Sequence, residues 1–102
     1  MGSGLSMRGR TERGMEQEEF KALLSSEGFE EVAVVAREPN GRVDEHVHTF
    51  EAKALILDGE IRLRIDEGER VYQPGQVFHI LPSVPHTEWY GPVGVKYLVG
   101  RK

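Results

Sequence analysis

The hydrophobic positions of the chain follow one period before Gly28 and another after it. Between residues 15 and 27, Phe20, Leu23 and Leu24 recur at the spacing of one helix face, and acidic residues occupy the first turn, where the helix dipole favours them. Gly28 stands where such a helix would end. We therefore predict one short helix over residues 15–27, which covers an opening of the fold.

From residue 29 onward the period shortens to two. Ile61, Leu63 and Ile65 alternate strictly with polar residues, as in a strand with one face in water. Gly, Pro, Asn and Asp recur every 8 to 12 residues and mark turns, and Asp58-Gly59 is typical of a β-hairpin. About eight short strands with this turn spacing predict an all-β sandwich or small barrel.

Composition narrows the class of protein. A chain of 102 residues without internal repeats predicts a single domain. The first fourteen residues carry three arginines and one glutamate, which gives them a formal charge of +2. Because the whole chain has a formal charge of −4, the remaining residues carry −6. We expect a flexible lead-in over residues 1–14 and a barrel over residues 15–102. An acidic body disfavours nucleic acid as a partner.

Three absences exclude further classes of protein. The chain has no cysteine, which excludes disulfides and thiolate metal sites. It has no apolar run of 18 residues, so no membrane span is expected. No apolar signal peptide is visible, and on this ground a cytoplasmic location is expected.

Histidines are the candidate chemistry of this chain. His46 and His48 are two residues apart, so in a strand both imidazoles point to one face and can reach a single ion at about 2.1 Å. Two histidines at this spacing, without a third ligand, are more often a surface feature than a metal site. His86 opens another predicted strand after a proline-rich turn, and a rolled antiparallel sheet can bring it beside the pair.

These residues give the chain a resemblance to the cupins, a family of small jelly-roll barrels with two short motifs. The first motif is Gly, five residues, His-x-His, three residues, Glu, six residues, Gly; the second places a Gly, a Pro-x-Gly, a His and an Asn at set spacings. Asn40 stands at the first Gly of the first motif, and Ala52 stands at its Glu. Other residues replace the Pro, Gly and Asn of the second motif: Leu81, Ser83 and Tyr90. The positions that match are His46, His48, Gly59, Gly75 and His86.

The resemblance implies an all-β jelly-roll (cupin) barrel with a short N-terminal helix. It also implies that His46, His48 and His86 bind one divalent transition metal, which would be Fe, Zn, Mn, Ni or Cu. Three neutral imidazoles suit Zn, Fe, Cu or Ni better than Mg or Ca. Ala52 removes one carboxylate ligand and its charge, so the site is expected to be more open than the usual one.

Two residues are candidates for acid–base chemistry. Glu88 shares the strand parity of His86, which makes it a replacement ligand or a general base, unless it is a solvated carboxylate at the barrel mouth. His79 is a fourth ligand or a proton carrier if it faces inward, and otherwise a buried structural histidine. Tyr90 is expected to pack with its hydroxyl bonded to a neighbour, and Glu51 to face away from the site.

The interpretation that follows is a metal-binding barrel that binds or transforms a small molecule at the three-histidine site. Oxygenase- or isomerase-like chemistry on a small carbonyl compound fits such a site. The alternatives are a non-enzymatic ligand-binding or sensor barrel and a barrel without metal. Because both faces of the strand around Phe78 are apolar, we expect Phe78 and Trp89 to form the patch of a homodimer.

Overall fold

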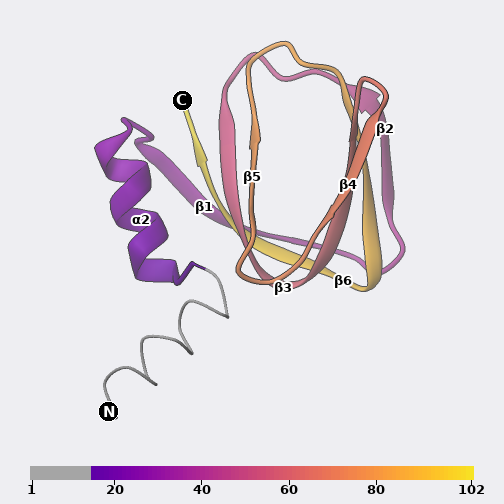
Figure 1. Cartoon of the computed structure of the whole chain (residues 1–102), viewed down its shortest axis with the longest axis horizontal. Helices are drawn as coiled ribbons and strands as arrows, with labels where there is room; N and C mark the ends of the chain where they lie inside the picture. Colours follow the sequence, from indigo (N-terminus) through magenta and orange to yellow (C-terminus); the bar gives the residue numbers. More distant parts are fainter. Residues whose placement is uncertain (1–14) are drawn as a thin grey trace.

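The structure is a computed structural model that describes residues 15–102, and it is mostly β with one short helix (Figure 1). One helix, α2 (Gln17–Ser26), precedes six strands: β1 (Glu31–Arg37), β2 (Arg42–His46), β3 (Ala52–Ile65), β4 (Gly68–Tyr72), β5 (Val77–Ile80) and β6 (His86–Arg101). The predicted helix is confirmed, two residues shorter at its start and one at its end. The lead-in predicted over residues 1–14 lies outside the described residues.

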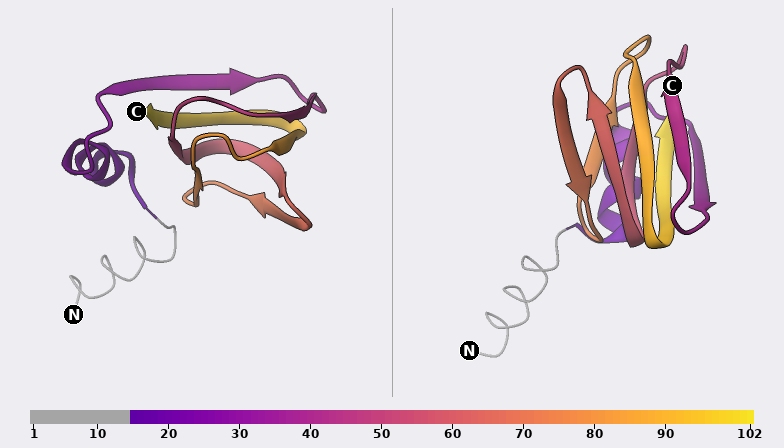
Figure 2. Two further views of the ribbon diagram at one scale, coloured as in Figure 1. Left: turned by 90° about the horizontal axis from the view of Figure 1, so that it is seen from above. Right: turned by 90° about the vertical axis from the view of Figure 1, so that its right-hand side faces the viewer.

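All six strands are antiparallel and form one sheet that rolls up around its inner face (Figure 2). The long strands β3 and β6 pair along most of their length and form its centre. β1 and β2 pair with the last and first parts of β6, while β5 and β4 pair with the first and last parts of β3. This arrangement is the predicted all-β jelly roll, because the two central strands each take part in both halves of the curled sheet.

The hairpin predicted at Asp58-Gly59 is wrong. β3 continues through these residues with β6 as its partner on both sides, and the register shifts at this point, as in a β-bulge. Gly59 has a φ of 71°, and a Cβ there would lie 2.0 Å from the carbonyl oxygen of Gly94. The turn-forming dipeptide therefore bends a continuous strand. β6 is likewise continuous past Gly94, which has a φ of 80°. The described residues therefore form six strands, where about eight shorter ones were predicted.

Two apolar clusters lie on opposite sides of the sheet. The inner cluster fills the roll and includes Ile61, Phe78 and Tyr97. The outer cluster joins residues of α2 to residues of β3 and β6 that point away from the roll: Phe20, Leu24, Leu55 and Leu98, together with Phe29. The helix thus covers the outer face of the sheet, and the prediction that it covers an opening of the fold is wrong. Within residues 15–102, no helix is long and apolar enough to span a membrane.

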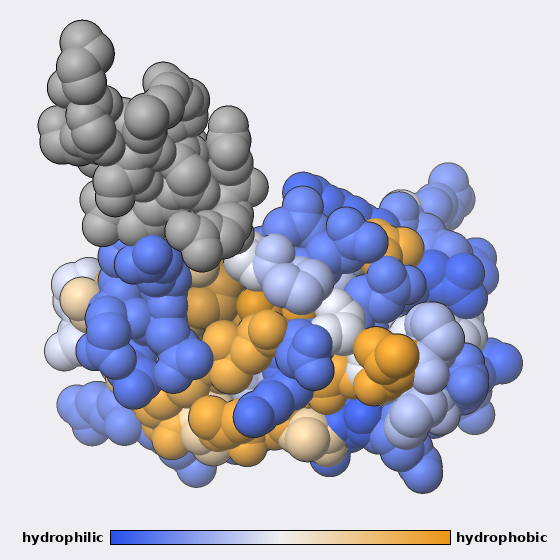
Figure 3. Space-filling view, turned by 90° about the horizontal axis from the view of Figure 1, so that it is seen from below, coloured by the Kyte–Doolittle hydropathy of each residue, from blue (hydrophilic) through white to orange (hydrophobic). Residues whose placement is uncertain are grey.

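The apolar patch expected from Phe78 and Trp89 does not form. Phe78 is 5% exposed and belongs to the inner cluster. Trp89 lies on the outer face, where the guanidinium groups of Arg42 and Arg62 are 5.5 and 4.5 Å from the centre of its ring. Hydrophobic residues on the face seen from below gather mainly in one area surrounded by polar ones (Figure 3). Exposed apolar side chains of the edge strand β1 are Val32 and Val34.

Candidate metal centre

Three histidines and one glutamate meet inside the roll: His46, His48, His86 and Glu88. One nitrogen or oxygen atom from each residue lies within 4.8 Å of the others. His46 ends β2 and is the cross-strand partner of His86, which opens β6. His48 lies two residues beyond the end of β2, and its ring centre is 4.8 Å from that of His46 and 5.0 Å from that of His86. The structure thus brings together the three histidines singled out from the sequence and, beside them, Glu88, which strand parity had placed on the face of His86.

Backbone hydrogen bonds hold two of the imidazoles in one orientation. Nδ1 of His46 lies 2.8 Å from the carbonyl oxygen of Asp44, and Nδ1 of His86 lies 3.0 Å from that of Val84. An Nδ1–H that donates to a carbonyl leaves Nε2 as the nitrogen with a free lone pair. Both rings therefore present Nε2 to the cluster. Within residues 15–102, the buried Nε2 of His86 has no hydrogen-bond partner, which is unusual for a buried polar atom.

Glu88 is tied into the cluster by both carboxylate oxygens. Oε2 lies 3.4 Å from Nε2 of His46 and 3.3 Å from Nε2 of His86, while Oε1 accepts a 2.9 Å hydrogen bond from the Tyr90 hydroxyl. Burial raises the pKa of Glu88, but the contact with His86, the hydrogen bond from Tyr90 and the nearby imidazoles outweigh it and lower the pKa overall. The side chain is 12% exposed, so it is not a solvated carboxylate at the mouth. The hydrogen-bonded hydroxyl predicted for Tyr90 is confirmed.

The titrating groups of the cluster influence one another. The contact of its Nε2 with the Glu88 carboxylate raises the pKa of His86, although burial opposes this. Burial lowers the pKa of His48, and the imidazoles of His86 and His46 lower it further. Burial, with the charge of Glu88 adding to it, raises the pKa of Tyr90. We therefore expect His48 to be neutral and Tyr90 to be protonated at neutral pH.

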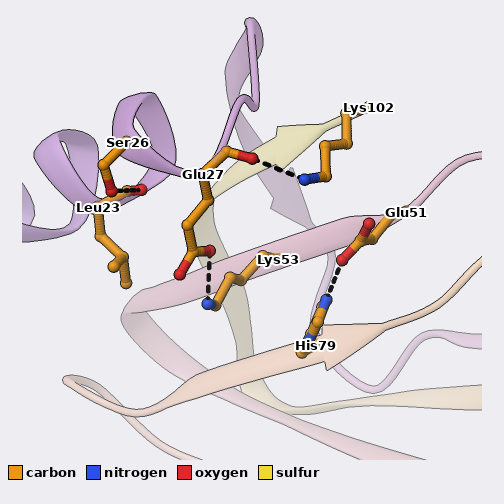
Figure 4. A network of polar contacts seen from close by, with 7 residues as sticks. All are labelled: Leu23, Ser26, Glu27, Glu51, Lys53, His79 and Lys102. Atoms are coloured by element: carbon orange, nitrogen blue, oxygen red, sulfur yellow. Dashed lines mark hydrogen bonds and ion pairs between the residues drawn. The ribbon is translucent and has the colours of Figure 1, made fainter.

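His79 lies outside the cluster. In the register of the sheet it stands opposite Lys53, on the outer face, and its Nε2 is 2.5 Å from Oε2 of Glu51 (Figure 4). Its side chain is 42% exposed, so it is neither a fourth ligand nor a buried structural histidine. Glu51 faces away from the site, as its parity predicted. Ala52 does line the site, and a methyl group there supplies no ligand atom.

A cavity of about 280 Å³ opens beside the cluster on the inner face of the sheet. Apolar and aromatic side chains form much of its wall, among them Phe50, Phe78 and Tyr97. Glu88 is the one acidic residue among the described residues that line it. A small molecule in this cavity would touch the imidazoles directly, which makes the cluster a candidate reaction or binding centre.

Comparison with known proteins places these features in a family. The family model of the cupin domain matches residues 33–90, which hold all four cluster residues. No curated protein sequence matches the chain. Many solved structures share its fold.

Three of these solved structures illustrate the likeness. KdgF from Halomonas sp. is 16% identical, with a TM-score of 0.57 over 70% of this chain and 67% of that one. A variant of oxalate decarboxylase from Bacillus subtilis is 18% identical, with a TM-score of 0.63 over 70% of this chain and 20% of that one. A Rhizobium leguminosarum protein of unknown function is 11% identical, with a TM-score of 0.66 over 69% of this chain and 66% of that one.

At these identities the structural likeness concerns the fold alone, and the aligned part spans from a fifth to about two thirds of the three proteins. The family match is independent of it and covers more than half of the chain. The rolled antiparallel sheet, the paired histidines at the end of β2 and the histidine that opens β6 agree with that match. The chain belongs to the cupin domain family.

Proposed function

We propose that the protein is a metal-dependent cupin that binds one divalent transition metal through its three histidines and one glutamate: His46, His48, His86 and Glu88. The observation that carries this proposal is that four potential ligand atoms lie within 4.8 Å of one another, while the buried Nε2 of His86 has no hydrogen-bond partner in the described chain. Three imidazoles and a carboxylate suit Fe, Zn, Mn, Ni or Cu.

The dimensions of the cluster fit one ion. Two atoms that bind the same ion at about 2.1 Å lie at most about 4.2 Å apart. The ligand atoms here lie within 4.8 Å of one another, so movements of less than about 1 Å would close the set. The carbonyl groups of Asp44 and Val84 support the fit, because they hold two imidazoles in the tautomer that binds metal through Nε2.

In this proposal, Glu88 supplies the carboxylate ligand that the first cupin motif would supply from position 52. Ala52 lines the same cavity but supplies no ligand atom. The Tyr90 hydroxyl donates to Oε1 of Glu88, and Oε2 faces two imidazole nitrogens. The carboxylate is thereby held by one oxygen and is free to bind an ion through the other. Its lowered pKa keeps it ionised for that purpose at neutral pH.

The function that this site supports best is binding and turnover of a small carbonyl or enol compound. When bound, a divalent metal supplies a Lewis acid that polarises a carbonyl oxygen. The aromatic side chains of Phe50, Phe78 and Tyr97 would exclude water from such a compound and orient it. One structural neighbour is named as an oxalate decarboxylase, which supports an enzymatic use of this fold.

Metal analysis of purified protein tests the proposal, with His48→Ala as the probe and His79→Ala as its matched control. Both variants lose one imidazole, but only His48 belongs to the cluster. After reconstitution with zinc and removal of excess ion, we expect about one zinc per chain in the wild type and in His79→Ala, and a sharp fall in His48→Ala. Undiminished zinc in His48→Ala, or an equal loss in both variants, would refute the site.

A further inference from the structure

His48 differs from the other two histidines of the cluster in how its ring is held. His46 and His86 each have Nδ1 close to a backbone carbonyl oxygen, but within residues 15–102 no group forms a hydrogen bond with the imidazole of His48. His48 lies in the segment that joins β2 to β3, and its carbonyl oxygen accepts a 2.8 Å hydrogen bond from the N–H of Ser83. This bond anchors the backbone and leaves the side-chain rotamer open, so another contact has to orient the ring.

The phenyl ring of Phe50 provides that contact. Its centre is 4.6 Å from the centre of the His48 ring, and the two planes are only 19° from parallel, which is a stacked arrangement. The rings of His46 and His86 are inclined to that of His48 by 74° and 51°, so neither of them stacks on it. A parallel neighbour restricts the plane of an imidazole, because rotation out of that plane gives up the stack.

Phe50 is itself fixed by the end of β6. Glu51, the next residue, exchanges two backbone hydrogen bonds with Lys102, of 2.8 and 3.0 Å. The guanidinium group of Arg101 lies over the Phe50 ring, 5.5 Å from its centre. The ring also packs against the inner apolar cluster. The support for the His48 imidazole therefore comes from the far end of the chain, through a side chain that has no metal-binding atom.

We propose that Phe50 is the positioning residue of His48, because it holds the imidazole by stacking in the rotamer that keeps a ring nitrogen among the ligand atoms of the cluster. This inference rests on the proposed function and adds to it a residue that binds no metal itself. Immobilising one free side chain weakens binding by about three- to tenfold, and a ligand that is already in place avoids this loss. The backbone carbonyl groups do the same for the other two imidazoles.

Competition for zinc with a chromophoric chelator tests the inference on three variants. Phe50→Leu keeps an apolar side chain and removes the flat ring, whereas Phe50→Tyr keeps the ring; Phe50 is half-buried, so the added hydroxyl group can reach water. We expect the dissociation constant for zinc to rise about three- to tenfold in Phe50→Leu and to stay within about twofold of the wild type in Phe50→Tyr. Phe29→Leu, which removes a phenyl ring from the outer cluster, should bind zinc as the wild type does.

Proton NMR of the metal-free protein observes the stack without zinc. The ring current of a stacked phenyl group moves the imidazole protons of His48 upfield, and His48→Ala assigns these signals by their loss. In Phe50→Leu they should move toward the position of the His79 signals, because His79 is exposed and no aromatic ring of residues 15–102 stacks on it. In Phe50→Tyr they should stay upfield. Thermal unfolding of the same samples checks that each variant is folded.

Three results would overturn the inference. If Phe50→Leu binds zinc within about twofold of the wild type, the stack does not prepare His48 for the ion. If Phe50→Tyr loses as much affinity as Phe50→Leu, or Phe29→Leu does, the flat ring at position 50 is not the cause of the loss. If the His48 signals are not upfield in the wild type, the rings do not stack in solution. The proposed function fails in a different way, when the wild type itself binds no zinc, and the positioning role then falls with it.

Discussion

Replacement of Glu88 by glutamine removes the negative charge of the cluster and preserves the shape of the side chain. The amide oxygen can still accept the hydrogen bond from Tyr90, so the strand and its packing should persist. What disappears is the charge that lies 3.3 Å from Nε2 of His86 and 3.4 Å from Nε2 of His46. We expect Glu88→Gln to fold normally and to bind metal much more weakly than the wild type.

The size of the effect follows from the burial of the carboxylate. Glu88 has a side chain that is 12% exposed, so water screens its charge only slightly. Removal of one partner from a buried pair of charges costs about 3 to 5 kcal/mol. The cavity beside Glu88 opens to solvent, and we therefore take the lower end, about 3 kcal/mol. At about 1.4 kcal/mol for each factor of ten, the dissociation constant for zinc should rise roughly 100-fold.

Competition with a chromophoric zinc chelator near neutral pH measures this change, and Glu51→Gln is the matched control. Glu51 is also a glutamate paired with a histidine, but it lies on the outer face beside His79. Its replacement should leave the zinc affinity within about twofold of the wild type, because it makes no contact with the cluster. Thermal unfolding of the metal-free variants checks that neither substitution disturbs the fold.

Two results would refute the reasoning. If Glu88→Gln binds zinc within about threefold of the wild type, the carboxylate is not a ligand and the three histidines act without it. If Glu51→Gln weakens zinc binding as much as Glu88→Gln does, the loss reflects the overall charge of the protein and not a contact in the site.

Four further predictions concern the site and the fold. Ala52→Glu in the Glu88→Gln background returns a carboxylate to the same cavity wall, so zinc affinity should recover by about tenfold or more in the same titration; no recovery would show that position 52 does not reach the ion. Acidification should weaken zinc binding, because protons compete for the imidazoles. The contact with Glu88 raises the pKa of His86, so this imidazole should be among the first to take up a proton, and a pH series of titrations should show affinity falling steadily as the pH is lowered; an affinity that does not change with pH would contradict histidine ligation. Gly59→Ala forces a side chain onto a residue with a φ of 71° and places its Cβ 2.0 Å from the oxygen of Gly94; urea unfolding should show a loss of at least about 2 kcal/mol, and a loss below about 0.5 kcal/mol would contradict the bulge. The exposed apolar side chains of the edge strand β1 lead us to propose a homodimer, and light scattering at micromolar concentration should give twice the mass of the chain; a monomeric mass would contradict it.

Local periodicity was sufficient to predict most of the candidate centre. His46 and His48 share a side because they are two residues apart, and Glu88 joins His86 for the same reason. Alternation along an extended chain is a property of the backbone and needs no tertiary contact. The helix was predictable on the same ground, because three apolar residues at helical spacing must face one way.

Residues whose orientation depends on a partner element could not be assigned in this way. His79 lies in a strand with apolar residues on both faces, and parity cannot say which face is the inner one. Both faces are apolar because α2 packs on the outer face over β3 and β6, while the other face lines the roll. Only this packing identifies the face of His79 as the outer one. Asp58-Gly59 shows the same limit: its residues favour a chain reversal, but β6 offers hydrogen bonds on both sides of it, and the dipeptide becomes a bend in β3.

The sequence by itself therefore determined which residues are candidate metal ligands and that the chain forms a mostly β fold with one helix, since both follow from spacing along the backbone. The tertiary structure alone decided what surrounds those ligands. Arg37 and Arg101 are separated by most of the chain, and they share a cavity only because β1 pairs with the end of β6 and the sheet then rolls up. Pairing between distant strands sets these neighbours, and nothing in the local pattern of either strand encodes it.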